Sequence, residues 1–341
     1  MQSRAFITGV SGPELTAAER EFIGSERPWG FILFKRNIET PQQVALLVQQ
    51  LRTSVDVPDA PILIDQEGGR VQRLGPPHWP VYPPGALFGA LYDVDPALGL
   101  AAARLSARLI AADLADLGIN ADCLPLADVP VAGADAVIGN RAYGTEPGKV
   151  AAIARAVTDG LEQGGILPVL KHIPGHGRAT ADSHFGLPTV DTPKKELERT
   201  DFAAFQPLSD LPMAMTAHVV FSALDPAHPA TTSATIIEQV IRGVIGFQGL
   251  LMSDDVSMNA LAGSIAERTR AIFSAGCDVV LHCNGRFDEM REVAAETPEL
   301  SGKALDRARR VLASRRAPQP FDRRSARAEL DAMMSRVGTR A

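Results

Sequence analysis

The sequence predicts an α/β protein that folds as a single (β/α)8 barrel over residues 1–341. Three observations support this fold class. Short apolar runs alternate with longer segments of helical periodicity, a pattern typical of parallel sheets. Eight such runs occur, which is the number that closes a barrel. Polar side chains gather where these runs end, and barrel enzymes build their active sites at the carboxyl ends of their strands.

The eight apolar runs are the candidate strands. They are Ala5–Thr8, Gly30–Phe34, Pro61–Asp65, Ile119–Ala121, Leu167–His172, Met213–His218, Leu250–Asp254 and Asp278–His282. The polar residues at the strand ends are Asp65, Lys171, His172, His218, Asp254 and His282. An open doubly wound sheet would instead concentrate its ligand groups at one switch point, usually with a glycine-rich phosphate turn. We find no such turn in that context, so the sequence favours the closed barrel.

The segments between the strands carry start and stop signals for helices. Thr40-Pro41 and Thr192-Pro193 place a capping hydroxyl before a proline at the first helical position. Glycines such as Gly118 and Gly276 follow candidate helices. Glycine is common directly after the last residue of a helix. The expected helices are Thr16–Ile23, Pro41–Thr53, Pro96–Leu117, Pro147–Gln163, Pro193–Phe205, Ala234–Ile245 and Ser264–Ser274, and the tail at 316–341 is expected to form a terminal helix near Ala326–Val337. The proline-rich stretch Gly75–Gly85 is expected to be a long loop at the barrel mouth.

The composition narrows the class of protein and of partner. Hydrophobic residues make up 45% and charged residues 22%, as in soluble globular proteins. The net charge of −6 argues against a nucleic-acid partner, and no apolar stretch is long enough for a membrane span. The amino terminus lacks the features of a signal peptide, and the odd number of cysteines fits a reducing compartment. We therefore expect a cytoplasmic monomer.

The densest cluster of reactive groups lies between Lys171 and His184. Within it, Asp182 precedes His184 by two residues and can accept the Nδ1 proton, which leaves Nε2 to exchange a proton with a substrate. Asp254 ends the seventh strand and is expected to point into the barrel mouth, where a carboxylate suits a nucleophile, a base or a metal ligand. For Asp255 we expect a turn cap instead.

Several residues of these segments also allow a different interpretation. Ser183 lacks a G-x-S-x-G elbow, which disfavours serine-hydrolase chemistry. His172 and His176 are four apart, but Pro174-Gly175 interrupts any helix between them, so a metal site is not expected. The segment Lys171–His184 could also be a histidine-rich surface loop whose hydrogen bonds are incidental and serve no function. In the charged turn Asp65–Arg73, acids can accept hydrogen bonds from sugar hydroxyls, whereas pairing of Glu67 with Arg70 would be purely structural.

Taken together, these segments resemble the family 3 glycoside hydrolases, and among them the single-domain bacterial β-N-acetylhexosaminidases of peptidoglycan recycling. The resemblance rests on several motifs in the right order. They are Gly30-Phe-Ile-Leu-Phe-Lys-Arg-Asn37, Ile64-Asp-Gln-Glu-Gly-Gly-Arg-Val-Gln-Arg73, Gly139-Asn-Arg141, Lys171-His-Ile-Pro-Gly-His-Gly177, Asp182-Ser-His184 and Ser253-Asp-Asp255. Ile173 stands where many relatives have phenylalanine, an apolar change that leaves the chemistry untouched.

The resemblance implies a role for each matched residue. Asp254 would be the nucleophile of a retaining glycosidase, and His184, backed by Asp182, would be the general acid and then the general base. The residues that would hold the terminal N-acetylglucosamine are Asp65, Arg73, Arg141, Lys171 and His172. Neither a cofactor nor a metal is implied. The substrate would be N-acetylglucosamine linked to 1,6-anhydro-N-acetylmuramic acid, with or without a peptide.

One departure from the usual glycosidase pattern leaves more than one function open. Retaining glycosidases normally use two carboxylates, whereas this chain offers one carboxylate and a His–Asp pair. The imidazole places less negative charge near the sugar, so an incoming phosphate would be repelled less and a phosphorylase on the same scaffold remains open. A metal-dependent barrel hydrolase and a non-catalytic barrel that binds muropeptides are less favoured by the same residues.

Overall fold

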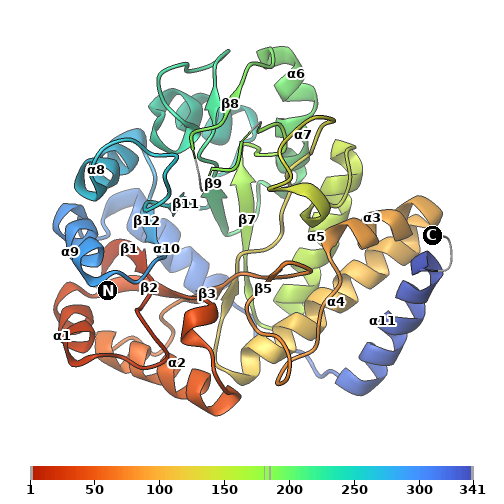
Figure 1. Ribbon diagram of the computed structural model, residues 1–341, viewed down its shortest axis with the longest axis horizontal. Coiled ribbons are helices and arrows are strands. Elements are labelled where there is room, and N and C mark those ends of the chain that lie inside the picture. Colours follow the sequence, from red (N-terminus) through yellow and green to blue (C-terminus); the bar gives the residue numbers. More distant parts are fainter. Residues whose placement is uncertain (1–2, 180, 184–185, 339–341) are drawn as a thin grey trace.

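The computed structural model describes residues 3–179, 181–183 and 186–338. Eight parallel strands close into a barrel in the order β1-β12-β11-β9-β7-β6-β3-β2, which confirms the predicted fold class (Figure 1). The strands are β1 (Arg4–Thr8), β2 (Pro28–Leu33), β3 (Ile62–Ile64), β6 (Ala121–Asp122), β7 (Leu167–Ile173), β9 (Met213–Thr216), β11 (Leu250–Asp255) and β12 (Val279–His282). Each overlaps one of the apolar runs that predict a strand.

Helices surround the barrel (Figure 1). They are α1 (Ala17–Glu26), α2 (Pro41–Val55), α3 (Gly85–Val94), α4 (Pro96–Asp116), α5 (Pro147–Gln163), α6 (Lys194–Arg199), α7 (Asp201–Phe205), the π-helix η5 (Ile236–Val244), α8 (Ile265–Ala275), α9 (Phe287–Glu296), α10 (Gly302–Ser314) and α11 (Arg323–Gly338). The predicted cap at Thr40 is present, since its side chain accepts a hydrogen bond from the Gln43 N–H. Within the described ranges, none of the helices has the length and apolarity that a bilayer span requires.

Several predictions about helices differ from the structure. The cap expected at Thr192-Pro193 is not formed, because α6 begins at Lys194 and has no side-chain cap. Helices α9 and α10 were not expected. The segment expected as one helix, 193–205, is two helices that meet at Thr200, whose backbone is non-helical (φ −119°, ψ −82°). Helix α3 was not predicted, because it contains Gly85 and Gly89, which disfavour helices. A Cβ at these positions would lie 2.1 Å from the carbonyl oxygen of Arg141 and 2.0 Å from that of Tyr143. The glycines therefore allow the segment that carries Arg141 to pack directly on α3.

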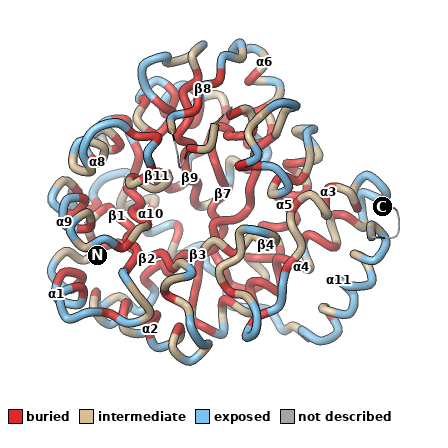
Figure 2. Tube along the Cα trace, in the orientation of Figure 1, coloured by how far each residue is buried: buried red, intermediate tan, exposed pale blue. Residues whose placement is uncertain are grey.

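The strands separate two apolar layers, because successive side chains of a strand point to opposite faces. In β1, Ala5 and Ile7 belong to the cluster that fills the barrel, whereas Phe6 packs in the larger cluster beneath the helices. Figure 2 shows the same division, with buried strands at the centre and exposed outer faces on the helices. The barrel interior is therefore a packed core, and its polar groups are concentrated at the carboxyl ends of the strands.

A short hairpin at the mouth brings charged residues over the barrel. It pairs β4 (Gln66–Gly68) with β5 (Val71–Gln72). Gly68 (φ +98°) could not carry a side chain there, because a Cβ would lie 2.4 Å from the carbonyl oxygen of Pro83. The Gly69 N–H donates to the Tyr82 carbonyl at 2.9 Å, so the hairpin is fixed to the loop that precedes α3. A second small pair joins β8 (Thr189–Val190) and β10 (Val220–Phe221).

The helix α11 covers α3 and α4 on the outside of the barrel (Figure 1). Its residues, Arg323–Gly338, include the range Ala326–Val337 in which the terminal helix was expected. Leu330 is buried in the main core cluster at 1% exposure, and the Arg327 guanidinium lies 4.7 Å from the ring centre of Tyr82. The carboxyl-terminal helix therefore contacts the loop that supports the β4–β5 hairpin.

We predict that Leu330→Ala lowers the free energy of unfolding by about 2–4 kcal/mol, because it removes a buried side chain and leaves a cavity. Urea denaturation followed by circular dichroism measures this change. Leu46→Ala is the matched control, since Leu46 is 53% exposed, and its effect should stay within about 0.5 kcal/mol. Equal effects of the two substitutions would contradict the packing of α11 described above.

Candidate active site

A pocket of about 720 Å³ opens at the carboxyl ends of the barrel strands. Its polar lining consists of Asp65, Arg73, Arg141, Lys171, His172, His176, Ser183, Asp254 and Asp255. Its apolar lining consists of Ile32, Phe34, Val71, Val137, Ile138, Met215, Met258 and Leu281, together with the thiol residue Cys283. Apolar walls with a few converging charges suit a ligand that has both hydroxyl groups and hydrocarbon faces.

The pocket brings together six of the eight residues that the sequence singled out, namely Asp65, Arg73, Arg141, Lys171, His172 and Asp254. Asp182 does not line it. Asp182 instead lines an adjoining hollow with Arg70 and Asp135, and Val137 borders both spaces. His184 lies outside the described residues.

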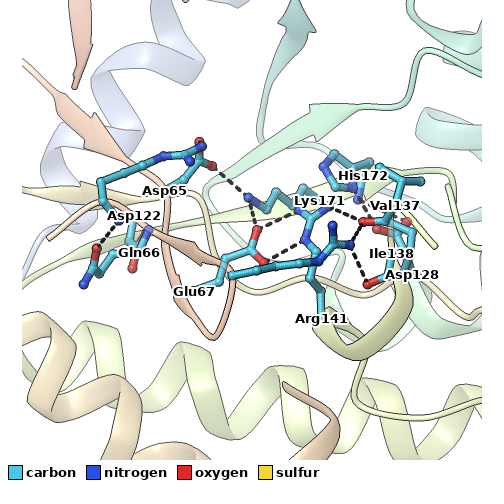
Figure 3. A network of polar contacts seen from close by, with 12 residues as sticks. Asp65, Gln66, Glu67, Asp122, Asp128, Val137, Ile138, Arg141, Lys171 and His172 are labelled. Carbon is cyan, nitrogen blue, oxygen red and sulfur yellow. Dashed lines mark hydrogen bonds and ion pairs between the residues drawn. The ribbon is translucent and has the colours of Figure 1, made fainter. Parts of the chain in front are cut away.

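An ion network of five side chains lies along one side of the pocket, and Figure 3 shows four of them, Asp65, Glu67, Arg141 and Lys171. Lys171 Nζ lies 2.9 Å from Asp65 Oδ1 and 2.7 Å from Glu67 Oε1, and its side chain is 2% exposed. Arg141 donates two hydrogen bonds to Glu67, at 2.9 Å from Nε and 2.8 Å from Nη2. Arg73 Nη2 lies 2.8 Å from Asp65 Oδ2. Each carboxylate therefore faces two cations.

This pairing favours the charged forms of Asp65, Glu67, Lys171 and Arg141. Burial alone would raise the pKa of Asp65, but Lys171 and Arg73 outweigh it and hold that pKa well below its usual range. For Glu67, Lys171 and Arg141 overcome burial and lower the pKa to about 2. Burial opposes the charge on Lys171, but the two carboxylates raise its pKa above the ordinary value. Three cations and two carboxylates leave one positive charge beside Asp254.

Asp254 lies near the end of β11 and faces the pocket. Its Oδ1 accepts a hydrogen bond from the Asp255 N–H at 2.8 Å. Burial would raise the pKa of Asp254, whereas His218 and His172, when they are protonated, together with the Asp255 N–H and Lys171, lower it below the ordinary value. The carboxylate is therefore ionised at neutral pH, which is the state that a nucleophile requires.

Asp128 is a site residue that the sequence analysis missed. It is fully buried, and its Oδ2 lies 2.7 Å from His172 Nδ1, while its Oδ1 accepts the His176 N–H at 2.6 Å. A carboxylate that accepts the Nδ1 proton fixes the tautomer of His172 and leaves Nε2 for a ligand. The predicted strand ended at Ala121. Had the predicted strand been extended to residue 127, Asp128 would have been expected at the barrel mouth.

His176 lines the same wall of the pocket. Its ring centre lies 5.6 Å from that of His172, and its Nε2 is 3.1 Å from Ser183 Oγ. Burial, reinforced by His172, lowers the pKa of His176 to about 4. The ring is therefore neutral at pH 7 and serves as a hydrogen-bonding group rather than a cation.

The structure decides two questions that the sequence left open. Glu67 pairs with Lys171 and Arg141, whereas Arg70 donates to backbone carbonyls, including that of Ala136 at 2.7 Å, so these two residues do not simply pair with each other. Asp255 caps a turn as expected, because its Oδ1 accepts the Ser257 N–H at 3.0 Å. Among the described residues, no three His, Cys, Asp or Glu side chains converge in a way that would hold a metal ion.

We predict that Lys171→Met destabilises the fold by about 3–5 kcal/mol, because Asp65 and Glu67 would lose their shared buried cation. Lys149→Met is the control, since Lys149 pairs with a carboxylate that is 67% exposed and should contribute less than about 1 kcal/mol. Chemical denaturation at several pH values measures both effects.

The pH dependence of the Lys171 effect follows from the lowered carboxylate pKa values. The pKa of Glu67 is at its ordinary value of 4.5 when the chain is unfolded and about 2 in the fold. The stabilisation by Lys171 is therefore complete above pH 4.5 and shrinks as the pH falls toward 2. A destabilisation that grows on acidification would contradict the ion network.

Comparison with known proteins agrees with this geometry. Residues 7–314 match the model of the glycosyl hydrolase family 3 N-terminal domain. A β-hexosaminidase from Alkalilimnicola ehrlichii is 39% identical over 82% of this chain and 80% of its own length. The structure of native NagZ from Neisseria gonorrhoeae superposes with a TM-score of 0.85 at 32% identity, over 99% of this chain and 98% of that chain.

The same Neisseria protein is also known in complex with N-trifluoroacetyl-D-glucosamine, and that structure gives a TM-score of 0.84 at 30% identity, over 99% of this chain and 98% of that one. The similarity thus spans the whole barrel and all of the strand ends that form the pocket. On this evidence the chain belongs to glycosyl hydrolase family 3.

Proposed function

We propose that this glycoside hydrolase of the β-hexosaminidase type is a retaining exo-β-N-acetylglucosaminidase. One observation carries the proposal: an ionised carboxylate, Asp254, shares a pocket with fixed charges that can hold sugar hydroxyls. The Neisseria relative that was crystallised with N-trifluoroacetyl-D-glucosamine supports a 2-acylamino sugar as the occupant. The relatives that are named β-hexosaminidase support the same sugar class.

The proposed reaction has two displacement steps. In the first, Asp254 attacks the anomeric carbon as the bond to the leaving oxygen breaks, and the protonated ring of His184 gives that oxygen its proton. In the second, a water attacks the glycosyl ester while His184 removes its proton, and Asp254 leaves as a carboxylate. Asp182 accepts the Nδ1 proton of His184 and so favours the protonated ring before the first step. The roles of Asp182 and His184 rest on the motif that they share with the family.

The ion network would bind the non-reducing sugar. Asp65 has oxygens that can accept hydrogen bonds from hydroxyls, and Lys171, Arg73 and Arg141 can donate to hydroxyl oxygens. Because these charges are already paired and buried, they change position little when a sugar binds, and preorganisation of this kind reduces the entropy lost on binding. His172, oriented by Asp128, completes the binding wall.

We further propose that the leaving group is 1,6-anhydro-N-acetylmuramic acid, with or without a peptide, and that the protein acts as a cytoplasmic monomer in cell-wall recycling. The adjoining hollow that Asp182 and Val137 border offers space for a second sugar beside the pocket. The resemblance to recycling enzymes supports this choice of substrate.

We predict that Asp254→Asn lowers kcat on an aryl β-N-acetylglucosaminide by roughly 10³-fold or more, since the amide cannot form the glycosyl intermediate. Release of the aryl alcohol in phosphate-free buffer with a chelator measures this loss. Asp288→Asn, on the exposed first turn of α9, is the matched control and should keep the wild-type rate. Near-normal turnover by Asp254→Asn would exclude Asp254 as the nucleophile, and strict dependence on phosphate would identify a phosphorylase.

We predict that His184→Ala affects substrates unequally. Disaccharides with a sugar leaving group need protonation of the departing oxygen and should lose about 10²–10⁴-fold in kcat/KM. Aryl substrates with acidic leaving groups need no such proton, so their first step should be nearly unaffected. Comparison of kcat/KM across a series of aryl leaving groups measures this effect. An equal loss on all substrates would contradict general acid catalysis by His184.

A further inference from the structure

A row of buried, hydrogen-bonded side chains lies directly beneath the segment that carries Asp254. His218 follows β9, is fully buried and does not line the pocket. Its Nε2 lies 3.0 Å from the backbone carbonyl oxygen of Asp255, and its Nδ1 lies 2.7 Å from Thr231 Oγ1. Thr231 Oγ1 in turn lies 2.8 Å from Thr216 Oγ1. All three side chains are shielded from solvent, so their hydrogen bonds are not exchanged for water.

The carbonyl at one end of these hydrogen bonds fixes the proton on His218 Nε2. A carbonyl oxygen can only accept, so Nε2 of His218 must carry a hydrogen. In a neutral ring Nδ1 then accepts, and the Thr231 hydroxyl supplies the donor at 2.7 Å. Because that hydroxyl has a single proton, its oxygen accepts from Thr216. The Ala217 carbonyl oxygen lies 3.0 Å from Thr231 Oγ1 and competes for this proton, so the relay requires that the hydroxyl donate to His218 Nδ1 instead. Burial lowers the pKa of His218, which agrees with a neutral ring.

At the other end of this row of hydrogen bonds lies Asp255, the residue next to Asp254. The Asp255 carbonyl accepts from His218 Nε2 and from the Met258 N–H at 3.1 Å. The Asp255 carboxylate accepts the Cys283 N–H at 3.0 Å, and the Asp255 N–H donates to Asp254 Oδ1 at 2.8 Å. Asp255 is thus anchored on several sides, and its N–H orients the Asp254 carboxylate.

We propose that His218 is a positioning residue for the nucleophile, and that the Thr216–Thr231 relay keeps it in the neutral Nε2–H tautomer that this task requires. This inference rests on the proposed role of Asp254. The neutral ring acts through a hydrogen bond to the backbone and contacts no substrate. With the opposite tautomer, Nε2 would present a lone pair to the Asp255 carbonyl, and the two would repel each other.

The relay can be tested by the rate of the first chemical step. A 5-fluoro-N-acetylglucosaminyl fluoride accumulates the glycosyl intermediate, because its good leaving group favours formation while the ring fluorine slows breakdown. We expect Thr231→Val to slow formation of the adduct on Asp254 roughly tenfold, since the isosteric side chain leaves His218 Nδ1 without a donor. Intact-mass and peptide-mass measurements follow the adduct. The dissociation constant for N-acetylglucosamine should be unchanged, because the relay does not reach the pocket.

Two variants distinguish a positioning role from a general packing role. Thr231→Ser keeps the hydroxyl and should restore the adduct rate to within about twofold of wild type. Thr158→Val makes the same change at a buried threonine of α5, whose hydroxyl donates to the Ala154 carbonyl of its own helix, and should leave the rate unchanged. Wild-type adduct rates in Thr231→Val, with the adduct on Asp254, would overturn the relay alone. Failure of the wild type to form any adduct on Asp254 would overturn the proposed nucleophile and the relay with it.

A second measurement reads the tautomer directly in the wild-type protein. Histidine labelled with ¹⁵N reports the protonation of each ring nitrogen by NMR, and His218→Asn identifies the signal that belongs to His218. We expect a neutral ring with the proton on Nε2 at pH 7. A proton on Nδ1, or an imidazolium at pH 7, would overturn the inference.

Discussion

The pocket depends on the ammonium group of Lys171, which lies between Asp65 and Glu67 inside the barrel mouth. Without it, two buried carboxylates would face each other across the strand end of β3 and the hairpin that follows. With it, Arg73 can take the outer side of Asp65, and Arg141 can take the outer side of Glu67 (Figure 3). The hairpin, β7 and the loop of Arg141 are thus held in one arrangement. The charges that fix the mouth of the barrel are thus also the charges that are available to a sugar.

Two further carboxylates are held without lysine or arginine. That of Asp128 contacts the His172 ring and accepts the His176 N–H. That of Asp255 accepts the N–H groups of Cys283 and Ser257 and so fixes the segment that carries Asp254. This division has a chemical consequence. The binding wall keeps a net positive charge, whereas the nucleophile side is oriented by neutral hydrogen bonds.

The sequence predicts the barrel well because its strands are short apolar runs whose ends carry charge, and this signal is local. It predicts the pocket residues Asp65, Lys171 and Asp254 for the same reason. It does not predict that Glu67 pairs with Arg141, because the two are 74 residues apart and meet only through the strand register and the close packing of Gly85 and Gly89. Asp128 was not predicted because Asp122 interrupts its apolar run directly after Ala121, where the predicted strand ends. The helix α10 was not predicted because its buried side chains, Ala308 and Val311, lie among many charged ones.

The most direct test of the central claim is the anomeric form of the first product. Attack by Asp254, followed by attack of water on the same face from which the leaving group departed, must release N-acetylglucosamine as the β-anomer before mutarotation mixes the two forms. Proton NMR spectra taken in the first minutes of hydrolysis distinguish the two anomeric protons. Initial release of the β-anomer is the result that this account predicts. Initial release of the α-anomer would mean a single displacement by water and would contradict the role of Asp254 as a covalent nucleophile.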